Sequence, residues 1–157
     1  MLFGLQGFTL LHIAISLAAI AAGFVMVGGF LTNNRLANQA FLLLTVATNV
    51  TAFFFPFSKL LPSHIVAIIS LVVLAVAIYA YYGQNLSGSW RRIYIGSALL
   101  ALYLNVFVLV VQTFAKNPAL AALAPTQSEG PFVLMQALTL LAFVTIGFHS
   151  IKRATQP

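Results

Sequence analysis

Long apolar runs separated by short polar stretches organise this chain. Five runs have about the length that a helix needs to cross the hydrocarbon core of a bilayer. They cover residues 8–31, 38–55, 63–82, 93–115 and 131–151. The stretches between them are rich in Pro, Gly, Asn and Ser, which are typical of connections between helices. The pattern predicts an all-α integral membrane protein, a compact bundle of five transmembrane helices in which residues 1–157 form a single membrane domain.

The run at residues 38–55 is the weakest of the five. Three threonines and Asn49 interrupt it, and Pro56 ends it. Threonine hydroxyls can bond back to the helix backbone, but an amide side chain in hydrocarbon needs a partner from elsewhere in the protein. We therefore expect Asn49 to face the interior of the bundle.

The run at residues 93–115 carries two amides, Asn105 and Gln112. They are seven residues apart, nearly two helical turns, and therefore project from the same side, which Ala98 and Ala101 continue. Because neither amide could be satisfied by lipid, this side is expected to face other helices or a ligand. The pattern predicts that this helix lies at the centre of the bundle.

Composition supports a membrane location. Hydrophobic residues make up 62% of the chain and charged residues 5%, with a mean hydropathy of +1.06, values typical of membrane proteins rather than soluble domains. The absence of cysteine excludes disulfides, thiolate metal sites, iron–sulfur clusters and cysteine nucleophiles. The cations flank the apolar runs instead of forming a basic patch with exposed aromatic residues, so we expect no nucleic-acid partner and instead contacts with lipid headgroups.

The distribution of charge predicts an orientation in the membrane. Seven Lys and Arg residues stand against one acidic residue. With five spans, one side holds Arg35, Arg91, Arg92, Lys152 and Arg153, and the other holds Lys59 and Lys116. Trp90 and Tyr94 beside two of these arginines are typical of the membrane interface. The positive-inside rule then predicts a protein of the cell inner membrane with its N-terminus outside and its C-terminus in the cytoplasm.

This topology gathers polar residues in the outer half of the bilayer. At about 1.5 Å rise per residue, the side chains of His12, Asn49, Gln112 and Gln136 lie roughly 5 to 9 Å inside the outer boundary. His64 begins its helix on that side, and Glu129 lies in the loop there. The arrangement predicts a pocket open to the outer face.

Two histidines at similar depth suggest two kinds of cofactor site. His12 and His64 come from different helices and could be the axial ligands of a haem b. With Glu129 they would give two imidazoles and one carboxylate, a set suited to a divalent metal such as iron or zinc. The competing interpretation is that each histidine bonds a backbone carbonyl or an interfacial water. His149, near Lys152 and Arg153, is expected to be interfacial.

The four amides Asn49, Asn105, Gln112 and Gln136 suggest a site for a quinone, a lipid or another small apolar ligand. They could instead bond one another across helices. No GxSxG, HExxH or Walker sequence occurs, so whether the protein is an enzyme stays open. Two functions follow: a ligand- or cofactor-binding membrane protein, with a redox role where the bound group is haem b or a quinone, or a non-catalytic accessory subunit packing in a homo-oligomer or larger membrane complex.

Overall fold

The computed structural model describes residues 2–32, 34–55 and 62–154, and every regular element among them is helical. The elements are α1 (Leu2–Thr32), α2 (Arg35–Ala52), α3 (Pro62–Ile78), a π-helical turn η1 (Tyr79–Gly83), α4 (Trp90–Lys116), α5 (Pro118–Leu123) and α6 (Gly130–Ala154). A helix lies in each of the five predicted ranges. Lys59, counted above among the outer cations, lies outside the described residues.

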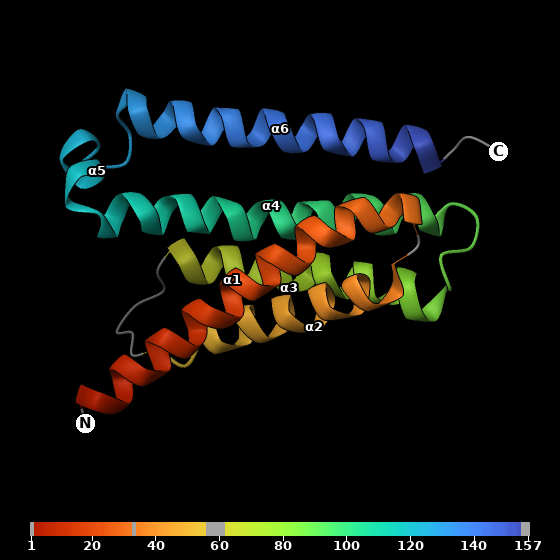
Figure 1. Cartoon of the computed structure of the whole chain (residues 1–157), viewed down its shortest axis with the longest axis horizontal. Helices are drawn as coiled ribbons and strands as arrows, with labels where there is room; N and C mark the ends of the chain where they lie inside the picture. The colour runs from red at the N-terminus through yellow and green to blue at the C-terminus, as the bar shows by residue number, and fades with distance from the viewer. Residues whose placement is uncertain (1, 33, 56–61, 155–157) are drawn as a thin grey trace.

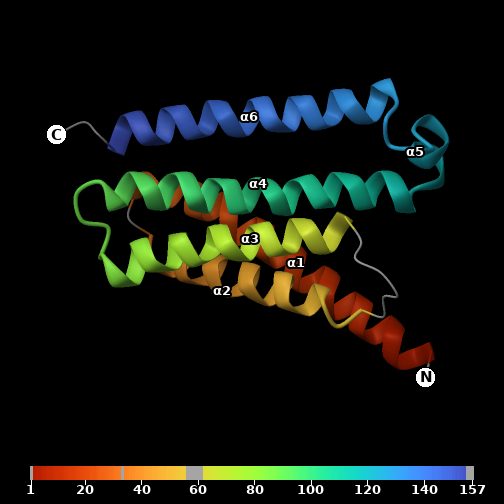
Figure 2. The same ribbon diagram turned by 180° about the vertical axis from the view of Figure 1, so that it is seen from behind.

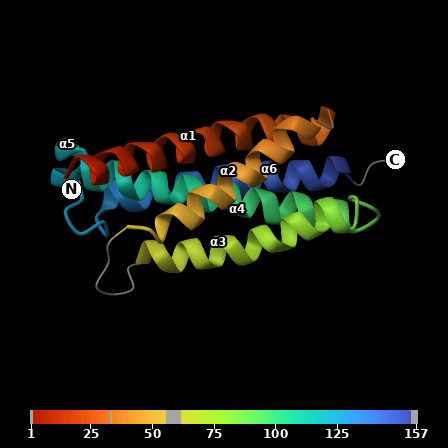
Figure 3. The ribbon, with the colours of Figure 1, turned by 90° about the horizontal axis from the view of Figure 1, so that it is seen from below.

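The long helices lie side by side, and α4 is central among them (Figures 1 and 2). It contacts α1, α2, α3, α5 and α6, which confirms the central position predicted from its amides. Figure 3 shows the long helices running roughly along one common direction, with α2 crossing obliquely, and Figure 1 shows the oblique course of α1. The start of α1 and the end of α6 lie at opposite ends of the bundle (Figure 1).

Four of these helices are long and apolar enough to cross a membrane: Gln6–Gly28, His64–Gly83, Trp90–Lys116 and Gly130–Ala154. The fifth predicted span, α2, is not among them. Its 18 residues include Arg35, Asn38, Thr45 and Asn49, and these lower its average hydropathy. The structure therefore supports an all-helical membrane protein with four clear candidate spans, one fewer than the sequence pattern predicts.

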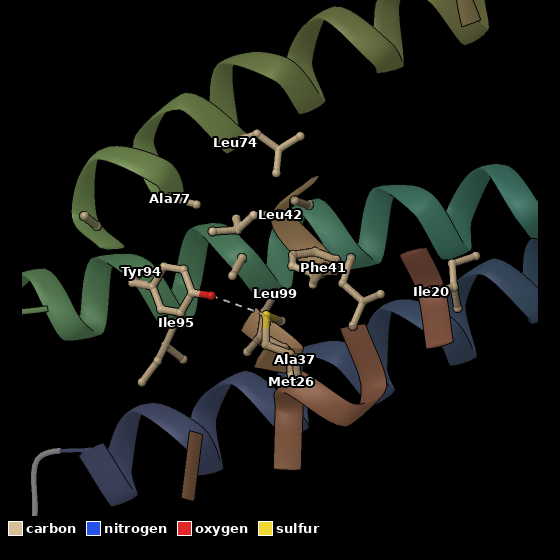
Figure 4. Packing of buried hydrophobic residues seen from close by; sticks show 14 of the residues in the cluster. Ile20, Met26, Ala37, Phe41, Leu42, Leu74, Ala77, Tyr94, Ile95 and Leu99 are labelled. Atoms are coloured by element: carbon tan, nitrogen blue, oxygen red, sulfur yellow. Dashed lines mark hydrogen bonds between the residues drawn. The ribbon is translucent and has the colours of Figure 1, made fainter. Parts of the chain in front are cut away.

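The bundle buries small and aromatic side chains and exposes many large aliphatic ones. Ala77, Ala98 and Ala101 are fully buried, so neighbouring backbones approach closely. Phe41 and Met26 fill the space between the helices (Figure 4). Leucine, isoleucine and valine side chains cover much of the outer surface of α1, α3 and α6. A surface of this kind suits lipid, because hydrocarbon tails are as apolar as the side chains themselves.

Asparagine side chains begin two of the helices. The side chain of Asn34 accepts a hydrogen bond of 3.0 Å from the backbone N–H of Ala37 and so caps α2. Asn117 accepts from the backbone N–H groups of Ala119 and Leu120, at 3.0 and 3.3 Å, and Pro118 follows it at the first helical position of α5. These caps place sharp turns between α1 and α2 and between α4 and α5.

Candidate functional site

Helix α2 turns its polar side chains into the bundle. Asn38, Thr45 and Asn49 follow one another at intervals of seven and four residues, which places them on one side of the helix, and all three are buried. The opposite side carries Leu36 and Leu43, which are 77% and 71% exposed. The burial of Asn49 confirms the inward direction predicted for it.

Asn49 joins α2 to α3. Its side-chain Nδ2 donates to the backbone carbonyl of Thr45 at 2.8 Å and to Oγ of Ser70 on α3 at 3.1 Å. Ser70 is itself buried. From α4, Nδ2 of Asn105 approaches Oγ1 of Thr45 at 3.4 Å, a long and therefore weak hydrogen bond. The two interior amides thus bond other side chains and backbone across three helices.

His12 on α1 bonds Thr51 near the end of α2. Its Nδ1 lies 2.7 Å from Oγ1 of Thr51. The same hydroxyl donates to the carbonyls of Ala47 at 2.7 Å and Thr48 at 3.0 Å, so its one proton is already used. With the hydroxyl proton on these carbonyls, we assign the N–H of the neutral imidazole to Nδ1, donating to Thr51. This leaves Nε2 with a lone pair, and none of the described residues donates a hydrogen bond to it.

Aromatic rings surround this imidazole. The ring of His12 meets that of Phe55 edge to face, with centroids 5.1 Å apart. Phe8, one turn earlier on α1, lies 5.0 Å from Phe55 and 6.5 Å from Phe54. We call the group of His12, Thr51, Phe8, Phe54 and Phe55 the His12 site. It is a partly buried hydrogen-bond acceptor in an aromatic setting, a combination common in sites for small apolar ligands.

His64 lies on the other side of the same end of α2. It is 3% exposed, and its ring packs 5.7 Å from that of Phe53. The two histidines therefore flank the Phe53–Phe55 turn from α1 and from α3, and no contact between their rings is seen in the described part of the chain. The structure supports their shared depth in the bundle and leaves the bis-histidine haem as a prediction.

The structure does not bring the predicted metal set of His12, His64 and Glu129 together. Across residues 2–32, 34–55 and 62–154 no three His, Cys, Asp or Glu side chains come together in a group that could hold a metal ion. Glu129 lies in the exposed loop between α5 and α6, directly before the first residue of α6. A carboxylate at the start of a helix is held there by local hydrogen bonds and the helix dipole, without any metal.

Glu129 gives the loop a pH-dependent element. Its carboxylate accepts hydrogen bonds from Oγ1 of Thr126 at 2.7 Å and from the backbone N–H groups of Thr126 and Ser128, both at 3.1 Å. The Thr126 hydroxyl and then these backbone bonds hold the pKa of Glu129 below its usual range. Since the folded pKa is lowered, the loop should be fully ordered above the usual pKa of about 4.3 and lose order as the pH falls through the lower, folded value. NMR shifts of the Thr126 and Ser128 amides should show this step, and Glu129→Gln should remove it.

The remaining two amides of the predicted site lie apart from the other two. Nε2 of Gln136 on α6 donates to the carbonyl of Phe107 on α4 at 3.2 Å, while its Oε1 is buried without a partner in the described structure. Gln112 is exposed on the surface of α4, contrary to the inward direction predicted for it. The four amides therefore do not line one pocket: two hold α2 to its neighbours, one joins α6 to α4, and one faces outward.

A second polar pair lies toward the other end of the bundle. The hydroxyl of Tyr94 donates to Oδ1 of Asn38 at 2.5 Å and approaches the sulfur of Met26 at 3.6 Å (Figure 4). Nδ2 of Asn38 donates to the carbonyl of Asn34 at 2.6 Å. Tyr94 is 1% exposed, so its ring faces the interior of the bundle rather than lipid. A buried tyrosine needs a hydrogen-bond partner, and Asn38 supplies it.

Sequence reasoning missed Ser70 and the role of Thr51. Ser70 is the sole polar residue between His64 and Tyr79. An isolated hydroxyl in so apolar a run is a signal that was available, because it indicates a face directed toward protein. The pairing of Thr51 with His12 depends on how α1 crosses α2, which spacing within one helix does not reveal. No protein-family model, curated protein or solved structure matches this chain.

Proposed function

We propose that this chain is a multi-pass membrane protein that binds a small apolar molecule with a hydroxyl donor, of the quinol class, at the His12 site. The observation that carries the proposal is the hydrogen bond of 2.7 Å between Nδ1 of His12 and Oγ1 of Thr51. With the proton assigned to Nδ1, Nε2 can accept a hydrogen bond from a ligand hydroxyl. Phe8 and Phe55 offer apolar surface for the ring of such a ligand.

We place all five long helices across the membrane in this proposal. The outward face of α2 is apolar and its polar residues are buried, which is the pattern expected of a helix surrounded by lipid on one side and protein on the other. Its 18 residues give a length of about 27 Å, close to the hydrocarbon thickness. An odd number of spans also agrees with the opposite positions of the start of α1 and the end of α6.

The proposed orientation follows from charge. Arg35 begins α2, Arg91 and Arg92 lie in the first turn of α4, and Lys152 and Arg153 lie in the last turn of α6. These starts and ends meet at one end of the bundle (Figure 1), which we assign to the cytoplasm of a cell with an inner membrane. The His12 site then lies in the outer leaflet.

The proposal is tested by binding of decylubiquinol, a short-chain quinol, to the purified protein. His12→Leu removes the acceptor and should weaken binding at least about tenfold, the loss expected when a ligand hydroxyl is left unpaired. Thr51→Val frees the imidazole to change tautomer and should give a smaller loss. His149→Leu is the matched control, because His149 is exposed and lies near the C-terminal end of α6, away from the His12 site. The His149→Leu protein should bind decylubiquinol as the unmodified protein does.

Equal affinity of the His12→Leu and unmodified proteins would contradict the proposal. An absorption spectrum of the purified protein distinguishes haem b from a quinol. The distinction is needed because Nε2 of His12 is also the atom that would ligate a haem iron. A Soret band that is lost in His12→Leu would show that the ligand of this site is haem b and not a quinol.

One observation favours the second candidate, a non-catalytic subunit of a larger membrane complex. Gln112 is exposed four residues before the end of α4, about 6 Å along the helix axis, and no described residue bonds its amide. An amide exposed at this depth of a membrane helix is commonly satisfied by a neighbouring chain. A photo-crosslinker at Gln112 should then capture a discrete membrane partner in cells, whereas the same group at exposed Leu109 marks the background from lipid-facing positions.

A further inference from the structure

A groove lies between α1 and α6 near the basic end of the bundle. It encloses about 330 Å³ and opens to the surface. It is lined by Val27, Gly28, Thr145, Ile146, His149, Ser150 and Arg153. It is separate from the His12 site, which is built on the first half of α1, the last turn of α2 and the phenylalanines that follow it.

The lining of this groove is polar on one side and apolar on the other. His149 and Arg153 are four residues apart on α6 and therefore project from one side of it. Nδ1 of His149 lies 2.9 Å from the carbonyl of Thr145, which fixes the ring against the helix. Val27 and Ile146 form the apolar wall, and a Cβ added at Gly28 would meet no atom within 4 Å, so the space beside this glycine is open.

Arg153 has no acidic side chain near it in the described part of the chain. The sole acid of the 157-residue sequence, Glu129, lies before the first residue of α6, whereas Arg153 lies in the last turn of that helix. Arg91, Arg92 and Lys152 add positive charge to the same end of the bundle. Arg153 can therefore take an anion as its partner in the groove, and a guanidinium binds phosphate oxygens in pairs.

We propose that this groove binds the phosphate headgroup of an anionic phospholipid. Arg153 and the hydroxyl of Ser150 bind the phosphate, and one acyl chain follows the wall formed by Val27 and Ile146. The occupant is a lipid rather than a soluble phosphate compound, because the polar rim passes directly into an apolar wall at the end of two membrane-spanning helices. Basic pockets between helices at the cytoplasmic side of a membrane are suited to such headgroups.

The test measures which lipids stay bound to the full chain. The protein is released from nanodiscs of equal parts phosphatidylglycerol and phosphatidylcholine, and the lipids that stay bound are identified and quantified by native mass spectrometry. The unmodified protein should retain phosphatidylglycerol in preference. Arg153→Gln should lower that preference about fivefold, the effect of removing one cation at the membrane surface. Gly28→Leu, which fills the open space, should lower the total lipid retained.

Lys152→Gln is the matched control, because it removes the same charge from the neighbouring residue, which does not line the groove. It should retain most of the preference. An equal loss in Lys152→Gln and Arg153→Gln would show only diffuse attraction between cations and lipid and would overturn the site. Displacement of phosphatidylglycerol by millimolar inorganic phosphate would show that the acyl chain contributes nothing and would overturn the assignment to a lipid.

Discussion

Replacing Gly23 with alanine should destabilise the bundle by about 1 to 3 kcal/mol, the usual cost of overfilling a packed core. Gly23 lies on α1 where it faces α2 and α4. A Cβ at this position would lie 2.4 Å from Cδ1 of Leu102 and 3.0 Å from Cδ2 of Phe41. Both of these side chains are fully buried, so neither can turn aside into free space. Thermal unfolding in detergent should show the loss as a lower midpoint.

Gly96→Ala is the control for this change. Gly96 is also inside a long helix, α4, but a Cβ there would meet nothing within 4 Å. Alanine is favoured over glycine in helices by about 1 kcal/mol, so Gly96→Ala should leave the midpoint unchanged or raise it. Opposite effects of the two substitutions would locate the sensitivity in the contact of α1 with α2 and α4. Equal effects would mean that glycine flexibility, rather than packing, decides the result.

The helices of this fold can be predicted from the sequence because a lipid environment imposes one simple requirement on the backbone. Backbone polar groups must be satisfied within each span, so every long apolar run has to be a helix. The same requirement makes α2 ambiguous, since its inward face is polar and its outward face is apolar. Hydropathy averages over both faces, and the average of α2 falls below that of α1, α3, α4 and α6. Only the arrangement of Asn38, Thr45 and Asn49 on one face indicates how the helix is used.

The partial failure of the amide prediction has a structural cause. Asn105 and Gln112 do project from nearly the same side of α4, as their spacing requires. Burial also requires a neighbour at that height, and the last turns of α4 extend beyond the start of α3 (Figures 1 and 2). Asn105 is therefore partly covered and bonds Thr45, while Gln112 is exposed. Helical spacing gives a direction, and helix lengths and crossing angles decide what lies there.

Replacing Asn49 with leucine should destabilise the protein by about 2 kcal/mol, although leucine is more apolar and nearly the same size. The change removes the hydrogen bond of 3.1 Å from Asn49 to Oγ of Ser70. The buried Ser70 hydroxyl then no longer receives this bond. Because this bond joins α2 to α3, its loss should loosen the helix that supplies Thr51 to the His12 site. Thermal unfolding and decylubiquinol binding should therefore both weaken, whereas Gln112→Leu, at an exposed amide, should change the unfolding midpoint little.

A double-mutant cycle with Ser70→Ala isolates the bond itself. Hydrogen bonds between membrane helices contribute on average about 0.6 kcal/mol and at most about 1.7 kcal/mol, so the coupling between Asn49→Leu and Ser70→Ala should fall within that range. A coupling near zero, with Asn49→Leu as stable as the unmodified protein, would mean that the polar face of α2 does not hold it in the bundle. The placement of α2 as a fifth span would then lose its main physical support, since hydropathy alone does not identify α2 as a membrane span.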